Sequence, residues 1–329
     1  MKKQIVVYSG YIKDANNAGP KAKIDVENIL VKKYNAKVVT LASTKTRLST
    51  VFQKICFYLK PLLSLNKIIV IQYPIGKHYL LTLNRNKILF IHDIEGLRNQ
   101  RIKRATKELK YFNSFKYIVC HNEKMKNYLI VNGVKAKIYT NELFDYLISE
   151  ENKEPHKDEK LELVYAGNIN KSAFYKKLDS KNMNFTINIY AGSKPENNNN
   201  SKIKYMGCYS PDELPSKIKG NLGLVWDGDI DDNDEFIGFK NYTKYNNPHK
   251  LSCYIAAGIP VIVWDKSAVS KFVKENDIGY LVNNINEINN INLKSYKTKL
   301  NNVKKIHKKV VNGEYTINVI NKILKDMEH

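Results

Sequence analysis

Short apolar runs, each followed by a polar loop and then by a helical pattern, recur along the whole chain. The clearest of these runs are residues 4–8, 68–72, 87–92, 161–165, 222–226 and 261–264. Uniformly apolar runs of this length are typical of strands buried on both faces, as in a parallel sheet. Their alternation with helices predicts a doubly wound α/β fold, in which ligands bind at the carboxyl ends of the strands.

A charged stretch divides these strands into two series. Residues 149–160 read SEENKEPHKDEK and contain Pro155, a composition typical of linkers. At 329 residues the chain is long enough for two domains with separate cores. We therefore expect a Rossmann-like N-terminal domain at residues 1–150, a linker at 151–160 and a second Rossmann-like domain at 161–312.

The charge balance bears on partners. The chain carries 54 Lys and Arg against 32 Asp and Glu, a formal charge of +22. The excess is lysine spread over the whole length, and neither an aromatic-plus-basic RNA-binding signature nor a zinc finger is present, so we predict no nucleic-acid partner. The charge favours anionic ligands and allows peripheral association with an anionic membrane surface.

Cysteine usage and hydropathy bear on the compartment. The four cysteines form no CxxC pair and have no histidine at metal-ligand spacing, which predicts free thiols in a reducing environment. No apolar run approaches the roughly 20 residues of a membrane helix. Residues 5–8 follow two lysines but are too few for a signal sequence, so we predict a cytoplasmic protein.

Residues 245–264, YNNPHKLSCYIAAGIPVIVW, combine an anion-binding pattern with a clear helix end. A polar loop leads into a short helix at Lys250, which Gly258 and Pro260 terminate before an apolar strand. Backbone N–H groups and a lysine at a helix start favour phosphate. From spacing alone, an ordinary crossover with a solvated Lys250 explains the pattern equally well.

Three further loops follow predicted strands. HDIEGLR at residues 92–98 has the composition of an acid/base or sugar-hydroxyl site, although a strand-capping His92 and a surface Arg98–Glu95 pair would also explain it. AGNINK at 166–171 lets the backbone approach a ligand. Tyr209 precedes SPDE, where Ser210 and Glu213 predict a capping box at a helix start.

An acidic stretch raises a metal alternative. Asp227-Gly228-Asp229 is formally a DxD motif of the kind that holds a divalent cation. The chain also supplies lysines and helix N-termini, which can neutralise phosphate without a metal. We therefore predict no metal ligand set and no cofactor.

The segment 245–264, with the loops at 92–98 and 166–171, resembles the GT-B glycosyltransferases. More narrowly, it is similar to a family that includes the third glycosyltransferase of serine-rich-repeat adhesin glycosylation and proteins labelled galactofuranosyltransferases. The resemblance implies two Rossmann-like domains facing a cleft, with the acceptor at residues 1–150 and the nucleotide-sugar at 161–312. The helix at 313–329 would cross back to the first domain or mediate oligomerisation.

The resemblance also implies site residues. His92 and Asp93 would be catalytic, by binding or polarising the acceptor hydroxyl. Lys250, Lys171 and the helix start would neutralise the departing diphosphate, and the Tyr209 ring would stack on uracil. The implied nucleotide-sugar contacts are Gly19, Gly167, Asn168, Lys171, Tyr209, Asn247, Pro248, His249, Lys250, Leu251 and Ser252.

The implied reaction is metal-independent and retaining. It transfers a hexose, glucose or N-acetylglucosamine, from a UDP-sugar to a GlcNAc-modified Ser or Thr of a serine-rich-repeat adhesin, by a dimeric or tetrameric enzyme. One alternative is galactofuranosyl transfer in cell-wall or capsular polysaccharide synthesis. Another is an inactive GT-B module that binds a glycan or a partner.

Overall fold

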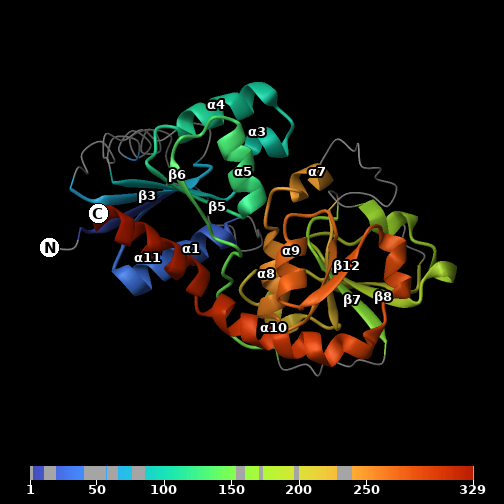
Figure 1. Ribbon diagram of the computed structural model, residues 1–329. Coiled ribbons are helices and arrows are strands. Elements are labelled where there is room, and N and C mark those ends of the chain that lie inside the picture. The colour runs from blue at the N-terminus through green and yellow to red at the C-terminus, as the bar shows by residue number, and fades with distance from the viewer. Residues whose placement is uncertain are drawn as a thin grey trace, which may run out of the picture. The chain divides into compact units, whose positions relative to one another are not determined.

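The computed structural model describes residues 3–10, 20–40, 57, 66–75, 86–152, 160–169, 173–195, 200–227 and 239–328 (Figure 1). The chain forms two compact units. The first unit comprises residues 1–142 together with 313–329, and the second comprises residues 143–312. Each unit is built on its own parallel sheet.

The sheet of the first unit is six-stranded in the described residues and entirely parallel, with the order β2-β1-β3-β4-β5-β6. Its strands are β1 (Ile5–Ser9), β2 (Lys37–Thr40), β3 (Ile68–Tyr73), β4 (Lys87–Ile91), β5 (Tyr117–Cys120) and β6 (Lys137–Thr140). The direction of winding reverses between β1 and β3. In a doubly wound sheet this switch point is where the carboxyl ends of two strands leave room for a ligand.

Helices cover both faces of this sheet (Figure 1). They are α1 (Lys21–Tyr34), α3 (Glu95–Arg98), α4 (Ile102–Phe112), α5 (Glu123–Val131) and α11 (Glu314–Glu328). Right-handed crossovers on the two sides of the switch point place α1 on one face and α4 and α5 on the other. The strands β1, β3 and β5 are buried throughout, as their uniformly apolar sequences predict.

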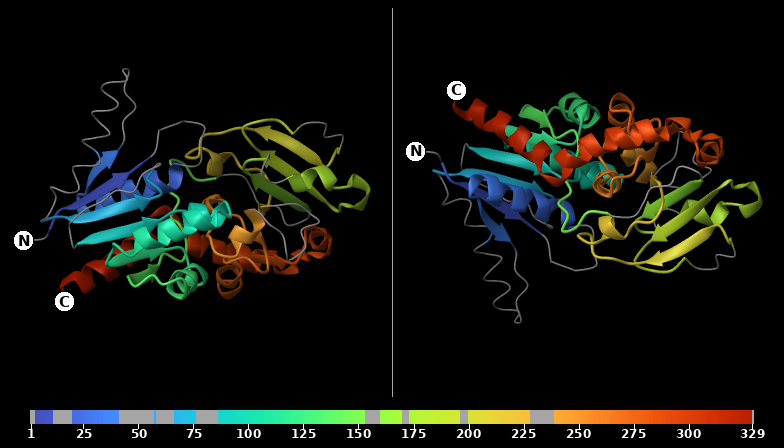
Figure 2. Two further views of the ribbon diagram at one scale, coloured as in Figure 1. Left: turned by 90° about the horizontal axis from the view of Figure 1, so that it is seen from above. Right: turned by 90° about the horizontal axis from the view of Figure 1, so that it is seen from below.

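The last helix completes the first unit. α11 packs against α1, and Figure 2 shows the two side by side. The Tyr34 hydroxyl donates to Asn321 Oδ1 at 2.8 Å. Gly313, which precedes α11, has φ +75°, and a Cβ there would lie 2.6 Å from Ile29 Cγ1, so only glycine fits both the left-handed backbone and the contact. The prediction that the C-terminal helix crosses back is confirmed.

The second unit holds a second parallel six-stranded sheet, with the order β12-β11-β10-β7-β8-β9. Its strands are β7 (Leu161–Ala166), β8 (Phe185–Tyr190), β9 (Ile203–Gly207), β10 (Leu222–Val225), β11 (Val261–Trp264) and β12 (Gly279–Val282). Numbered within the unit this order is 6-5-4-1-2-3, the Rossmann arrangement, with its switch point between β7 and β10. The doubly wound architecture predicted for both halves of the chain is confirmed.

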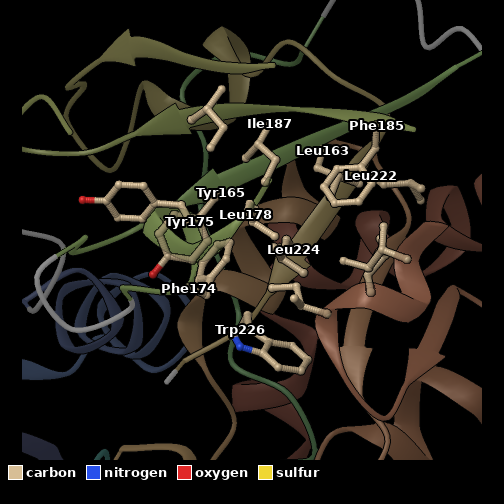
Figure 3. Close-up of a cluster of buried hydrophobic side chains, with 14 of the residues drawn as sticks. Leu163, Tyr165, Phe174, Tyr175, Leu178, Phe185, Ile187, Leu222, Leu224 and Trp226 are labelled. Atoms are coloured by element: carbon tan, nitrogen blue, oxygen red, sulfur yellow. The ribbon is translucent and has the colours of Figure 1, made fainter. Parts of the chain in front are cut away.

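One face of this sheet carries an aromatic-rich core. Alternate residues of each strand share a face, and Leu163 and Tyr165 of β7 therefore meet Leu222 and Leu224 of β10 in one buried cluster (Figure 3). Phe174 packs edge-on against Tyr165 with ring centroids 5.1 Å apart. This cluster fixes the strand ends at which the candidate site lies.

The helices of the second unit are α6 (Leu214–Lys217), α7 (Phe239–Thr243), α8 (His249–Ala256), α9 (Ser270–Glu275) and α10 (Tyr296–Val311). Short 3₁₀ helices lie at Ala173–Lys177, Ser180–Asn182, Ile285–Asn290 and Leu293–Ser295. α8 packs on the sheet and is covered by α10. Among the described residues, no helix combines the length and the apolar character that crossing a membrane would take.

The predicted capping box at Ser210 is wrong in detail. α6 begins at Leu214, and Ser210 Oγ donates to the Glu213 carboxylate at 2.7 Å. Residues 211–213 form a turn, and Pro215 occupies the first turn of the helix, a position where its missing N–H costs nothing. The second proline was thus the better marker of the helix start. Linker residues 153–159 lie outside the described residues.

Candidate functional site

The start of α8 lies where the sequence places it. Pro248 is extended, with ψ 131°, and provides no side-chain cap for the helix. At its other end Gly258 has φ +78°, and the strand β11 follows. A helix N-terminus without a side-chain cap keeps backbone N–H groups and the positive end of the helix dipole for a ligand. This terminus lies near the carboxyl ends of β7 and β10.

The Lys250 side chain runs from α8 to these strand ends. Its Nζ donates to the Trp226 carbonyl at 2.9 Å and to Asp227 Oδ1 at 2.5 Å. The ammonium also lies 4.9 Å from the centroid of the Tyr165 ring, a cation–π distance. Trp226 and Asp227 directly follow β10, and Tyr165 belongs to β7, so Lys250 spans the switch point.

The surroundings of Lys250 keep it charged. Burial lowers the pKa of Lys250, but the Asp227 carboxylate and Tyr165 raise it by more than burial lowers it. The net shift of this pKa is therefore upward. The side chain is only 15% exposed. A permanently charged, partly desolvated ammonium interacts more strongly with an incoming anion than a fully solvated one does.

Gly167 lies against this lysine. A Cβ at Gly167 would be 2.7 Å from Lys250 Cε, so any side chain there would displace the lysine. The Gly167 N–H bonds the Tyr190 carbonyl at 3.0 Å, which continues the β7–β8 pairing by one residue. Asn168 beyond it is exposed, and Ile169 is buried and holds the turn against the core. Two predicted site segments, 166–168 and 248–250, therefore meet.

Tyr254 attaches α8 to the sheet at the same point. Its hydroxyl accepts from the Ala166 N–H at 2.8 Å and donates to the Leu224 carbonyl at 3.2 Å. Burial raises the pKa of Tyr254 well above its usual value, so the hydroxyl stays protonated. The ring lies on Gly223, where a Cβ would be 2.2 Å from Tyr254 Cγ. Sequence reasoning missed Tyr254, although its i, i+4 spacing from Lys250 puts both on one helix face.

Other predicted residues of α8 contact the protein itself. Ser252 is fully buried and donates through Oγ to the Phe144 carbonyl at 2.7 Å. The His249 ring stacks on Tyr146, with centroids 4.8 Å apart. Leu251 is buried in the unit, and Asn247 is buried just before Pro248. These contacts fix the position of α8 within the second unit.

Tyr209 lies two strands away from the lysine. It follows β9, and the residue is 38% exposed. The centroid of the ring is 6.1 Å from that of Tyr190 on β8. An exposed, partly supported aromatic ring at this edge can stack on a planar base.

His92 lies in the first unit, at the carboxyl end of β4. Its Nε2 is 2.7 Å from Gln72 Oε1. The Gln72 amide nitrogen faces Ser9 Oγ at 2.6 Å and the Lys23 carbonyl at 3.1 Å. Because a carbonyl can only accept, the amide nitrogen must face Lys23 and its oxygen must face His92. The His92 proton on that side is therefore on Nε2.

Asp93 and the loop that follows are held by ion pairs and a buried carboxylate. Asp93 pairs with Arg98 at 2.6 Å, whereas Glu95 pairs with Arg104 of α4, so the Arg98–Glu95 pair considered from the sequence is wrong. Fully buried Glu108 accepts from the N–H groups of residues 95 and 96 at 3.0 and 2.7 Å and from the Tyr73 hydroxyl at 2.5 Å. The loop is therefore rigidly built.

Three candidate residues lie outside the described part of the chain: Gly19, Lys171 and Asp229. Of the DxD pair only Asp227 is described, and its carboxylate bonds Lys250. Within the described residues, no group of three or more His, Cys, Asp or Glu side chains has the arrangement of a metal site.

Two family models match the chain. The model described as "Glucosyltransferase 3-like, N-terminal domain" matches residues 4–143, and the model described as "Glucosyltransferase 3-like, C-terminal domain" matches residues 163–323. The first match spans the sheet of the first unit, and the second spans the sheet of the second unit from Leu163 of β7 onward.

Two curated proteins are similar in sequence over most of their length. The chain is 32% identical over 254 residues to "Beta-1,6-galactofuranosyltransferase WbbI" of Escherichia coli (strain K12), covering 72% of this chain and 71% of that protein. It is 25% identical over 240 residues to "Glucosyltransferase 3" of Streptococcus gordonii, covering 71% of this chain and 69% of that one.

Solved structures are similar at much lower identity. Sucrose-phosphate synthase from Thermosynechococcus elongatus superimposes with a TM-score of 0.67 at 11% identity, covering 99% of both chains. HepE of Anabaena, solved with UDP and glucose, gives a TM-score of 0.61 at 10% identity, covering 99% of this chain and 100% of that one. At such identities the likeness concerns the fold, and it confirms the predicted GT-B architecture.

Proposed function

The chain belongs to the glucosyltransferase 3-like family of sugar transferases, and we propose that it transfers a sugar from a UDP-activated donor. The observation that carries this proposal is the charged Lys250 at the switch point of the second sheet, beside the start of α8. A departing UDP leaves as a dianion or trianion, and a fixed ammonium with helix N–H groups stabilises that charge in the transition state. HepE, a GT-B protein solved with UDP and glucose, supports the choice of nucleotide.

Galactofuranose is our first candidate for the transferred sugar. The identity of 32% to the Escherichia coli galactofuranosyltransferase exceeds the 25% identity to the Streptococcus gordonii glucosyltransferase. The alternative considered from the sequence, galactofuranosyl transfer in surface polysaccharide synthesis, is thus better supported than glucosylation of an adhesin. The acceptor in this proposal is a hydroxyl of a growing polysaccharide.

The proposed roles follow the two units. In the second, Lys250 and the N–H groups of α8 bind the diphosphate, the turn at Gly167 and Asn168 brings backbone close to it, and Tyr209 stacks on uracil. In the first, His92 and Asp93 bind the acceptor hydroxyl. His92 is held by Gln72 and Asp93 by Arg98, so both would act from fixed positions.

The test is a transfer assay on the purified protein with UDP-galactofuranose, UDP-glucose and UDP-N-acetylglucosamine, with and without EDTA. We expect one donor to be used, with EDTA having no effect. Lys250→Ala should lower kcat/KM by about 100-fold or more, since a charged contact to the leaving group is lost. The matched control is Lys271→Ala on α9, an exposed lysine with an i, i+4 partner, which should leave kcat/KM unchanged.

The outcomes are distinct. Equal losses of kcat/KM in Lys250→Ala and Lys271→Ala would refute the assigned diphosphate site. Inhibition by EDTA would instead support the hypothesis that Asp227 and Asp229 bind a divalent cation. UDP binding without transfer to any acceptor would favour the inactive binding module. NMR of the product settles the stereochemistry: from the α-configured UDP-galactofuranose, retention gives an α linkage and inversion a β linkage.

Glucosyl transfer to GlcNAc-modified Ser or Thr is the second candidate. The matches of both halves to the glucosyltransferase 3-like models and to the Streptococcus gordonii protein favour it. Preference for UDP-glucose together with a GlcNAc-peptide acceptor would select this function over the first. We also propose a cytoplasmic homo-oligomer, which light scattering on the purified protein would test.

A further inference from the structure

The pairing of β7 with β10 stops before either strand ends. The register joins Leu222 to Leu163 and Gly223 to Val164. Continued by one step, it would join the Ala166 N–H directly to the Leu224 carbonyl. The Tyr254 hydroxyl lies between these two groups instead, accepting from the first at 2.8 Å and donating to the second at 3.2 Å. The Tyr254 hydroxyl therefore bridges the two strands where the next backbone hydrogen bond of the sheet would otherwise form.

The position of this oxygen is fixed by the helix and by Gly223. Tyr254 is fully buried, and its ring fits on β10 only because residue 223 has no Cβ. Lys250 lies one turn earlier on the same helix face and contacts Gly167, the residue after Ala166. Tyr254 thus bonds the residue before the glycine turn, while Lys250 touches the turn itself.

We propose that Tyr254 is a positioning residue that holds β7 and β10 apart at their carboxyl ends, so that the Gly167 turn and the Lys250 ammonium together form the seat of the donor diphosphate. The inference rests on the proposed function, because it deepens the role of the same site. Tyr254 acts through its neighbours and does not touch the ligand.

A phenylalanine at this position separates the two parts of the side chain. The ring would still pack on Gly223, so the core would keep its volume. The Ala166 N–H and the Leu224 carbonyl would lose their shared partner. These two buried groups would then either stay unpaired or bond each other directly, which would close the gap between the strands. Closing the gap would move the glycine turn relative to Lys250.

The chain offers a matched control for this change. Tyr296 is also buried in the second unit, and its hydroxyl donates to the Asn221 carbonyl at 3.2 Å, just before the amino end of β10. Tyr296→Phe also removes a tyrosine hydroxyl that bonds a backbone carbonyl. This carbonyl lies at the amino end of β10, away from the candidate site. Loss of stability is expected from both variants.

The experiment measures the affinity of wild type, Tyr254→Phe and Tyr296→Phe for UDP, inorganic pyrophosphate and uridine by calorimetry. We expect Tyr254→Phe to weaken UDP and pyrophosphate by about tenfold or more while uridine stays within about twofold. Tyr296→Phe should change none of the three. In a Lys250→Ala background, Tyr254→Phe should weaken UDP binding clearly less than it does in wild type, because both residues contribute to the same diphosphate site.

Each other outcome counts against a specific statement. If wild type binds UDP and Tyr254→Phe binds it equally well, or loses UDP and uridine in parallel, Tyr254 has only a structural role. If the diphosphate-specific loss is found but no sugar is transferred, the inference stands and the proposed function fails. If wild type binds neither UDP nor pyrophosphate, both are overturned.

Discussion

At the carboxyl edge of the first unit's sheet, buried and half-buried polar side chains bond to one another, whereas the corresponding edge of the second unit has a glycine turn beside a lysine–aspartate pair. Ser9, Gln72 and His92 form one hydrogen-bonded set in the first unit. In the second, Gly167 and Gly223 leave space that Lys250 and Tyr254 fill. Bonded side chains shape the first edge, whereas the second is shaped by glycines and by the two α8 side chains that fill the space beside them.

The difference suggests what each edge is for. A network whose donors and acceptors are already matched holds its members in place, and a new ligand must compete with those bonds. An edge of glycines and backbone N–H groups allows close approach, which suits phosphate. We therefore expect changes in the first unit to act on stability or, at His92 and Asp93, on acceptor binding, and changes around Lys250 to act mainly on UDP affinity.

Glu108→Ala should show the largest difference between an effect on stability and an effect on UDP affinity. The change removes a fully buried carboxylate that accepts three hydrogen bonds, and we expect a loss of about 3 kcal/mol from the first unit. UDP affinity should stay within about twofold. Both tryptophans, Trp226 and Trp264, lie in the second unit, so circular dichroism should report the loss while tryptophan fluorescence follows the second unit separately.

Glu123→Ala, on the exposed start of α5, is the control and should change neither signal. If Glu108→Ala weakened UDP as strongly as Lys250→Ala does, the proposed division between the two edges would be wrong.

Asp227→Asn should act in the opposite way. Asp227 holds Lys250 in place but also repels a diphosphate, so removing its charge should tighten UDP binding by up to about tenfold. The free energy of unfolding should fall by about 1 to 3 kcal/mol, since the pair is mostly buried and the lysine loses its counter-ion. Calorimetry with UDP checks the first expectation and urea unfolding the second.

Asp277→Asn is the matched control, because Asp277 also pairs with a lysine of the second unit, Lys299, and should leave UDP affinity unchanged. Weaker UDP binding in Asp227→Asn would mean that Asp227 positions Lys250 more than it competes for it.

Lys23 should give the smallest effect, a change in pH dependence. Burial lowers its pKa to about 8, although Asp93 and Glu27 raise it. Between that value and the ordinary 10.5 the unfolded chain binds more protons than the folded one, so this contribution to stability rises with pH. The unfolding free energy of wild type minus that of Lys23→Met should increase by about 1 kcal/mol from pH 7 to pH 9. A difference that stays flat would show Lys23 to be well solvated.

The strands and the helix ends were predictable, because their signals are local. Uniform apolar runs gave β1, β3 and β7, and Gly258 and Gly313 mark helix ends where φ is positive. Local signals misled where two were in conflict: Ser210 and Pro211 look like a helix start, but the helix begins after them, around Pro215.

The partners of the candidate residues were not predictable, because each comes from a distant strand or helix. Lys250 pairs with Asp227, 23 positions away, and His92 with Gln72, 20 positions away. The surface pair of Arg98 with Glu95 considered from the sequence joins near neighbours, whereas in the structure Arg104 of α4 pairs with Glu95. The spacing of Tyr254 from Lys250 puts both residues on one helix face, but nothing in the segment indicates that the Tyr254 hydroxyl bonds two strands.

The return of the chain to the first unit has a consequence for its synthesis. α11 carries Val319, Ile320 and Ile323 into the first unit, where they are buried and the helix packs on α1. The ribosome makes residues 1–142 first, yet these cannot cover their apolar surface until all of residues 143–312 have followed. The second unit is continuous in sequence and can fold as it emerges. The part of the chain that is synthesised first therefore completes its fold last, and until α11 is made the apolar surface that it covers stays exposed.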